Sequence, residues 1–181
     1  DVFPTAHISY NIADATQLMT SYSRRIRRPD GRDLDPFMSY IDQYTIRVGN
    51  PNLKPEYTNS YELQLLQRFG QNFLSLDAFY RTTNDLMTRV QDLRNDGIIY
   101  MTTDNINNDY SLGTELMGNV NITKWFNLNT SFSIYNYQIK GTINNESIDR
   151  ESTNYSLRGN ATIKLGQNSR VQWTSMFRGP S

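Results

Sequence analysis

Hydrophobic and polar residues alternate with a period of two along most of this chain. The segment 153–165 shows the pattern most clearly, because its odd positions from Tyr155 onward are apolar or small and its even positions are polar. Such alternation is typical of a β-strand with one apolar and one polar face. Helical periodicity is scarce elsewhere. The pattern therefore predicts an all-β protein.

Eight segments follow this alternation, and residues typical of turns separate them. We expect an all-β, antiparallel up-and-down meander of about eight long strands, forming a single domain over residues 1–181. An interruption of the fifth strand near 104–109 is left open. The predicted strands span residues 5–12, 16–27, 57–68, 72–91, 98–121, 126–139, 153–165 and 170–177.

The connections between these strands alternate between short and long. Short turns are expected at about 13–15, 69–71, 122–125 and 166–169, and longer loops at 28–56, 92–97 and 141–151. The loop 28–56 holds four of the six prolines, and we expect one short helix in it at Asp33–Met38. Pro51 and Pro55 lack a backbone N–H, so the stretch Gly49–Glu56 is expected to be loop.

The length of the strands indicates a membrane protein. Strands in soluble sheets have about 5–6 residues, whereas a strand that crosses the hydrocarbon of a membrane needs about 9–11. Outer-membrane barrels also carry short turns at one rim and long loops at the other. These features favour part of a transmembrane β-barrel over a soluble all-β domain with one wet face. Since the chain starts at Asp1 without a signal peptide, we expect a fragment of a longer protein.

Composition narrows the chemistry further. The 18 basic and 18 acidic residues balance, so bulk charge gives no reason to expect nucleic-acid binding. The chain has no cysteine, which excludes disulfides and thiolate metal sites. Its single histidine, His7, has no Ser-His-Asp or Cys-His constellation around it in the sequence. We expect no enzymatic activity, no cofactor and no bound metal.

Six blocks of the chain stand out as a set, in this order along the sequence: Tyr22–Pro29, Asp33–Phe37, Gly49–Glu56, Ser60–Leu63, Phe79–Leu86 and Tyr110–Leu116. Together they resemble the barrel of TonB-dependent outer-membrane receptors, most closely the large outer membrane protein β-barrel group. The resemblance implies a 22-stranded barrel with an amino-terminal plug domain, of which this chain holds about eight strands and no plug. It also implies import of a scarce nutrient, such as an iron chelate, a cobalamin or an oligosaccharide, with energy supplied by TonB.

The resemblance implies the partners as well. These are the lipid of a Gram-negative outer membrane, a small-molecule nutrient, and TonB acting through a plug domain absent from this chain. An open sheet in lipid would leave unpaired backbone groups at two edges, and each such group costs several kcal/mol. Edge-to-edge self-association of the isolated chain is therefore a further expectation.

Candidate ligand-binding residues lie in or beside the loop 28–56, because loops at the open rim of a barrel carry binding residues. Arg25 and Arg27 belong to a dense arginine cluster that can bind an anionic ligand or lipopolysaccharide phosphates, or simply face a polar lumen. Asp33, with nearby aspartates, offers oxygen donors for Ca²⁺, although the spacing is not that of an EF-hand. Tyr40 and Tyr44 can stack on a sugar or a chelate, or pack the loop against its neighbours.

Two alternatives of other classes stay open at this point. One is a small closed eight-stranded barrel with a structural or adhesive role and no transport. Such a barrel fills its interior with side chains, whereas Asn127, Asn129, Ser131 and Ser133 are small and would leave a void. The other is a soluble β-rich binding module.

Overall fold

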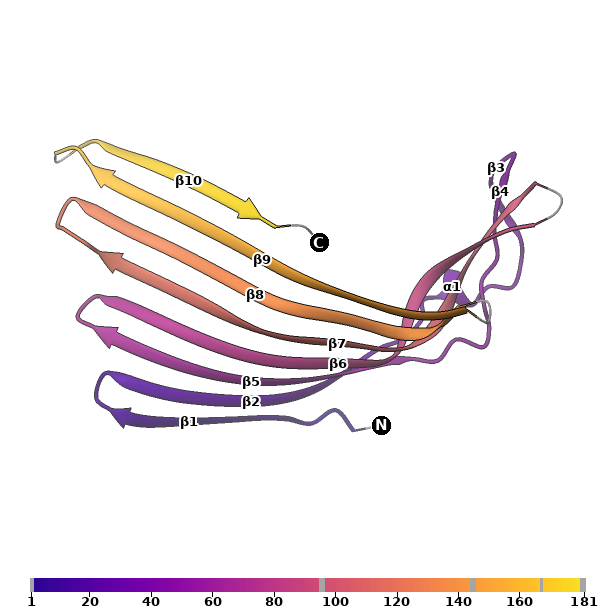
Figure 1. The fold of residues 1–181 in the computed structure, drawn as a ribbon, viewed down its shortest axis with the longest axis horizontal. Coiled ribbons are helices and arrows are strands. Elements are labelled where there is room, and N and C mark those ends of the chain that lie inside the picture. The colour runs from indigo at the N-terminus through magenta and orange to yellow at the C-terminus, as the bar shows by residue number, and fades with distance from the viewer. Residues whose placement is uncertain (1, 95–96, 144–145, 167, 180–181) are drawn as a thin grey trace.

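The computed structural model describes residues 2–94, 97–143, 146–166 and 168–179. Eight long strands form an antiparallel meander in which each strand pairs with the next along the path (Figure 1). The predicted fold class is confirmed. The meander strands are β1 (Thr5–Ala13), β2 (Thr16–Arg27), β5 (Glu56–Phe69), β6 (Asn72–Leu93), β7 (Ile99–Asn121), β8 (Phe126–Ile143), β9 (Glu146–Lys164) and β10 (Arg170–Arg178). Among the described residues β1 and β10 do not pair, so the curved sheet is open.

The strand register brings apolar side chains into continuous rows on one face. One row crosses all eight strands, and most of its members are exposed to the surroundings. No second layer of the described chain covers this face. We call it the apolar face. The row consists of Tyr10, Leu18, Leu65, Leu76, Leu116, Phe132, Leu157 and Phe177.

The opposite face, here called the polar face, carries charged, amide and hydroxyl side chains. Short side-chain hydrogen bonds join its residues, both between neighbouring strands and along one strand. Gln64 Nε2 donates to Ser75 Oγ at 3.0 Å, and Ser75 Oγ donates to Asp77 Oδ2 at 2.7 Å. The hydroxyls of Ser133 and Ser156 lie 2.9 Å apart. The same side chains can also form hydrogen bonds with water, so the polar face is suited to an aqueous compartment.

A separate cluster of structure, here called the far module, is built at the end of the sheet away from the short turns (Figure 1). It contains α1 (Gly31–Leu34), β3 (Ser39–Asp42), β4 (Thr45–Arg47) and the ends of β6 and β7. The strand β4 pairs with β7 in parallel, from Thr45 opposite Ile99 to Arg47 opposite Met101. The buried apolar side chains of the described chain gather here: Ile46, Leu53, Met87, Val90 and Ile106.

The sequence predicted that the segment 28–56 is a loop with one short helix. The structure differs, because this segment also contains β3 and β4. A close backbone approach fixes its path, because Gly49 N donates to Asp35 O at 2.8 Å and Asn50 N donates to Asp33 O at 2.6 Å. A Cβ atom on Gly49 would lie 2.5 Å from Asp35 O and 2.6 Å from Asp35 N. Only glycine allows this approach without displacing the backbone.

The helix expected at 33–38 lies earlier, at Gly31–Leu34. Asp30 caps it by accepting hydrogen bonds from the backbone nitrogens of Arg32 at 2.8 Å and Asp33 at 3.0 Å. The bond from Asp33 is the main reason why the pKa of the Asp30 carboxyl lies below its usual value. Pro36 disfavours a helical conformation in the preceding residue, and Asp35 is extended. No helix in the described part of the chain is long and apolar enough to cross a membrane.

The sequence left open an interruption of the fifth strand near 104–109. In the structure β7 runs through this stretch and keeps one register with β6, from Thr88 opposite Asp104 to Asn84 opposite Asn108. One expectation about the connections is wrong. The polar loop expected at 141–151 is mostly strand, because β8 and β9 stay paired out to Ile143 opposite Glu146. Residues 95–96, 144–145 and 167, at three of the predicted connections, lie outside the described residues.

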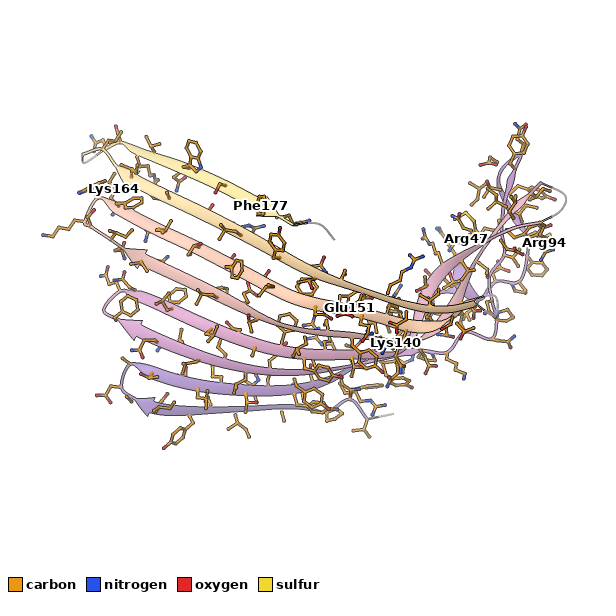
Figure 2. The ribbon with its side chains drawn as sticks, in the orientation of Figure 1. Arg47, Arg94, Lys140, Glu151, Lys164 and Phe177 are labelled. Atoms are coloured by element: carbon orange, nitrogen blue, oxygen red, sulfur yellow. The ribbon has the colours of Figure 1, made fainter. Side chains whose placement is uncertain are left out.

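The polar composition of this β8–β9 extension misled the sequence interpretation. Its polar side chains pair with one another across the strands, as in the ion pair between Lys140 Nζ and Asp149 Oδ2 at 3.9 Å. Asn136 Nδ2 likewise donates to Glu151 Oε1 at 2.8 Å. Lys140 and Glu151 mark this region in Figure 2. A hairpin with water on both faces needs no alternation of polar and apolar residues. A polar sequence in this segment therefore did not exclude a β-strand.

Candidate functional site

A polar hollow of about 440 Å³ opens on the polar face where β2, β5 and β6 approach the far module. Nearly all its lining side chains are polar or charged, and none is aromatic. Three arginines against two glutamates leave one net positive charge. The lining residues are Ser23, Arg25, Ile26, Arg27, Glu56, Thr58, Ser60, Glu62 and Arg81.

Glu56 is the structural anchor of this hollow. It is 5% exposed, and its carboxylate accepts from Arg27 Nη1 at 3.1 Å and from the backbone nitrogen of Met87 at 2.7 Å. One side chain therefore joins three strands. The sequence interpretation placed Glu56 in a loop, which is wrong, because Pro55 allows a strand to begin directly after it. The polar residues Glu56, Thr58 and Ser60 alternate along the chain, and this pattern would have placed Glu56 on the polar face.

Glu62 and Arg81 form a second, more open pair. Glu62 Oε1 accepts from Ser60 Oγ at 3.1 Å and lies 3.7 Å from Arg81 Nη2. Both charged side chains are about half exposed, so solvent screens the pair and it contributes only about 0–1 kcal/mol to stability. Its charged groups stay accessible to a ligand. Neither residue was singled out from the sequence, although the alternation in β5 and β6 would have placed both on this face.

Arg25 is exposed and lines the same hollow. Among the described residues no carboxylate lies within 4.0 Å of its guanidinium, whereas Arg27 and Arg81 each have one. Its cross-strand neighbour is Thr58. Of the three arginines that line the hollow, Arg25 is therefore the one whose charge can pair with an anionic group of a ligand.

The other predicted residues lie in the far module. Asp33 Oδ1 accepts from Arg47 Nη2 at 3.0 Å and from Thr103 Oγ1 at 3.1 Å, so its carboxylate joins α1 to β4 and β7. Tyr40 and Tyr44 stand on the β3–β4 hairpin and are 74% and 61% exposed. The structure thus brings Arg25 and Arg27 together and places Asp33 and the two tyrosines elsewhere.

The aspartates around 30–42 are engaged locally. Asp30 caps α1, and Asp35 and Asp42 accept backbone N–H groups of Phe37 at 3.0 Å and Tyr44 at 2.7 Å. Within residues 2–94, 97–143, 146–166 and 168–179, no group of three or more His, Asp or Glu side chains is placed to hold a metal ion.

An open curved sheet has one apolar and one polar face, long strands, short turns at one end, and the far module with the extended β8–β9 hairpin at the other. Such a sheet defines a segment of an outer-membrane β-barrel wall. The chain matches the model of the outer membrane protein beta-barrel family over residues 1–181 and belongs to that family. The protein is thus one of the Gram-negative outer membrane, with its apolar face toward lipid and its polar face toward the barrel interior.

Solved receptor structures share this fold. The siderophore receptor PirA from Pseudomonas aeruginosa superposes with a TM-score of 0.76 at 18% identity, over 98% of this chain and 30% of its own. A mutant of the ferric enterobactin receptor PfeA from the same species gives 0.61 at 11% identity, over 95% and 34%. The copper transporter OprC gives 0.56 at 13% identity, over 95% and 30%. The chain thus spans about a third of each receptor. No curated protein matches its sequence.

Proposed function

We propose that this chain forms part of the wall and the outer rim of a TonB-dependent receptor that imports a scarce nutrient. An iron chelate, a cobalamin and an oligosaccharide are the candidate ligands. Support comes from the family and from the similar structures, which are a siderophore receptor, a ferric enterobactin receptor and a copper transporter. TonB would act through a plug domain outside this chain, and the barrel would perform no catalysis.

The far module lies on the outer side of the membrane in this proposal. Short turns join the strands at the opposite end, as at the Gly70 turn, and barrels of this kind carry their short turns on the periplasmic side. The free edges at β1 and β10 then pair with further strands of a longer receptor, or with a second copy of the isolated chain.

The hollow around Arg25 is the proposed ligand contact, and the unpaired charge of Arg25 is the observation that carries the proposal. A hydrophilic ligand with an anionic group fits a lining of hydroxyls and arginines. Tyr40 and Tyr44 would offer rings for stacking at the rim. A ligand contact by Asp33 stays a prediction, and its carboxylate already binds Arg47 and Thr103.

Replacing Arg25 by glutamine in the whole receptor should weaken binding of the cognate ligand by about tenfold or more, because a charge-assisted hydrogen bond is lost. Isothermal titration with a panel of ferric chelates, cobalamin and oligosaccharides measures this and identifies the ligand class. Lys164→Gln is the matched control, since Lys164 lies at the opposite end of the sheet (Figure 2). If wild type and R25Q bind the ligand with equal affinity, the hollow does not contact the ligand.

A further inference from the structure

Arg24 stands on the apolar face, where a cation is unexpected. β2 alternates, so Arg24 shares a face with Tyr22 while the adjacent Arg25 points to the polar face. Tyr22, Tyr61 and Tyr80 form a row directly beside it, with ring centres 4.9 and 6.2 Å apart. Tyrosine rows mark the border between hydrocarbon and headgroups. Arg24, one register row beyond the tyrosines, therefore lies at headgroup depth.

The guanidinium of Arg24 is held in a defined place. Its Cζ atom lies 5.0 Å from the ring centre of Tyr57, which is further toward the far module than Asn59, the register partner of Arg24. The side chain thus reaches away from the apolar rows, as expected of a cation at a membrane border. The hydroxyl of Tyr22 reaches the same way and donates to Asn59 Oδ1 at 3.0 Å.

No carboxylate in the described part of the chain balances this charge. Among the described residues none lies within 4.0 Å of Arg24, whereas Arg27, Arg47 and Arg81 each have a carboxylate partner. A cation at the edge of the hydrocarbon needs an anion from its surroundings. The fork of N–H groups on a guanidinium matches the oxygens of a phosphate.

We infer that Tyr22, Arg24, Tyr57 and Asn59, here called the Arg24 cluster, bind a phosphate group of an outer-leaflet glycolipid. Arg24 supplies the charge and the forked donors. The amide nitrogen of Asn59, whose oxygen accepts from Tyr22, supplies a second donor. The tyrosine rings pack against the upper part of the acyl chains. The inference rests on the proposed orientation of the far module toward the outer side, and it concerns the lipid-facing surface rather than the hollow.

The test compares lipid binding by the whole receptor in neutral detergent, read by native mass spectrometry. Bisphosphorylated lipid A and its dephosphorylated form are the two probes. Wild type should prefer the phosphorylated lipid, and Arg24→Gln should reduce that preference by about tenfold. Arg25→Gln, one residue away on the opposite face, should keep it. Tyr57→Phe should keep it as well, and Tyr57→Leu should weaken it because the guanidinium loses its support.

Three results would overturn the inference. They are an unchanged preference in R24Q, an equal loss in R25Q, and displacement of the lipid by millimolar inorganic phosphate, which would indicate a site for soluble anions. Titration with the nutrient panel distinguishes this failure from failure of the proposed function. A receptor that binds its nutrient but shows no Arg24-dependent lipid preference refutes only the lipid site.

Discussion

Replacing Phe132 by arginine is expected to lower the free energy of unfolding of the membrane-inserted receptor by about 2–4 kcal/mol, the cost of a cation at the midplane of the lipid face. Phe132 lies in the apolar row that crosses all eight strands, with Leu116 and Leu157 as its direct neighbours. There is no water at this depth to solvate the charge. Urea titration of the receptor in phosphatidylcholine vesicles, followed by tryptophan fluorescence, measures the loss.

Ser133→Arg is the control for this substitution. Ser133 is the next residue along β8 but points to the polar face, where it opposes Glu115. The new cation would have a carboxylate neighbour and water, so stability should change by less than about 1 kcal/mol. If the two arginine variants lose the same stability, the assignment of the faces to lipid and interior is wrong.

Replacing Glu56 by alanine is expected to cost about 1–3 kcal/mol, because the buried N–H of Met87 loses its acceptor. The ion pair with Arg27 adds little to this figure, since the arginine side chain is 67% exposed. Exchange of the amide hydrogens of residues 84–90 should accelerate together with the drop in stability. Hydrogen exchange with mass spectrometry, alongside urea titration, measures both effects.

Two variants separate the causes at Glu56. Glu56→Gln keeps an oxygen acceptor for Met87 and should lose less stability than Glu56→Ala. Glu62→Ala removes a carboxylate that is about half exposed and should cost under about 1 kcal/mol. If E62A and E56A lower the free energy of unfolding by the same amount, the buried acceptor at Glu56 is not what stabilises the contact between β2, β5 and β6.

The meander was predictable because its information is local. A strand with one lipid-facing side alternates with a period of two, and this phase assigns each residue to a face without knowledge of the register. The alternation in β2 puts Arg25 and Arg27 on the polar face in this way, in agreement with the polar-lumen interpretation of these two residues. The same reasoning, applied to Glu56, Glu62 and Arg81, would have completed the lining of the hollow.

The far module was not predictable because its contacts are distant in sequence. β3 and β4 have four and three residues, too few to show a period. Parallel pairing of β4 with β7 joins Thr45 to Ile99, and no local pattern announces it. The place of Asp33 depends likewise on Thr103, 70 residues away, so its role in joining strands could not be seen from its neighbours.

Alternate residues of each strand face lipid and the barrel interior, and site-directed spin labelling tests this most directly. This chain has no cysteine, so once any cysteine elsewhere in the receptor is replaced by serine, single cysteines at positions 155–163 of β9 can each carry a spin label in membranes. Oxygen dissolves in lipid, so collisions with oxygen should increase the relaxation rate of labels at odd positions. A water-soluble nickel chelate should increase the relaxation rate of labels at even positions. Equal accessibility at odd and even positions, or access of the nickel chelate to all of them, would contradict the account.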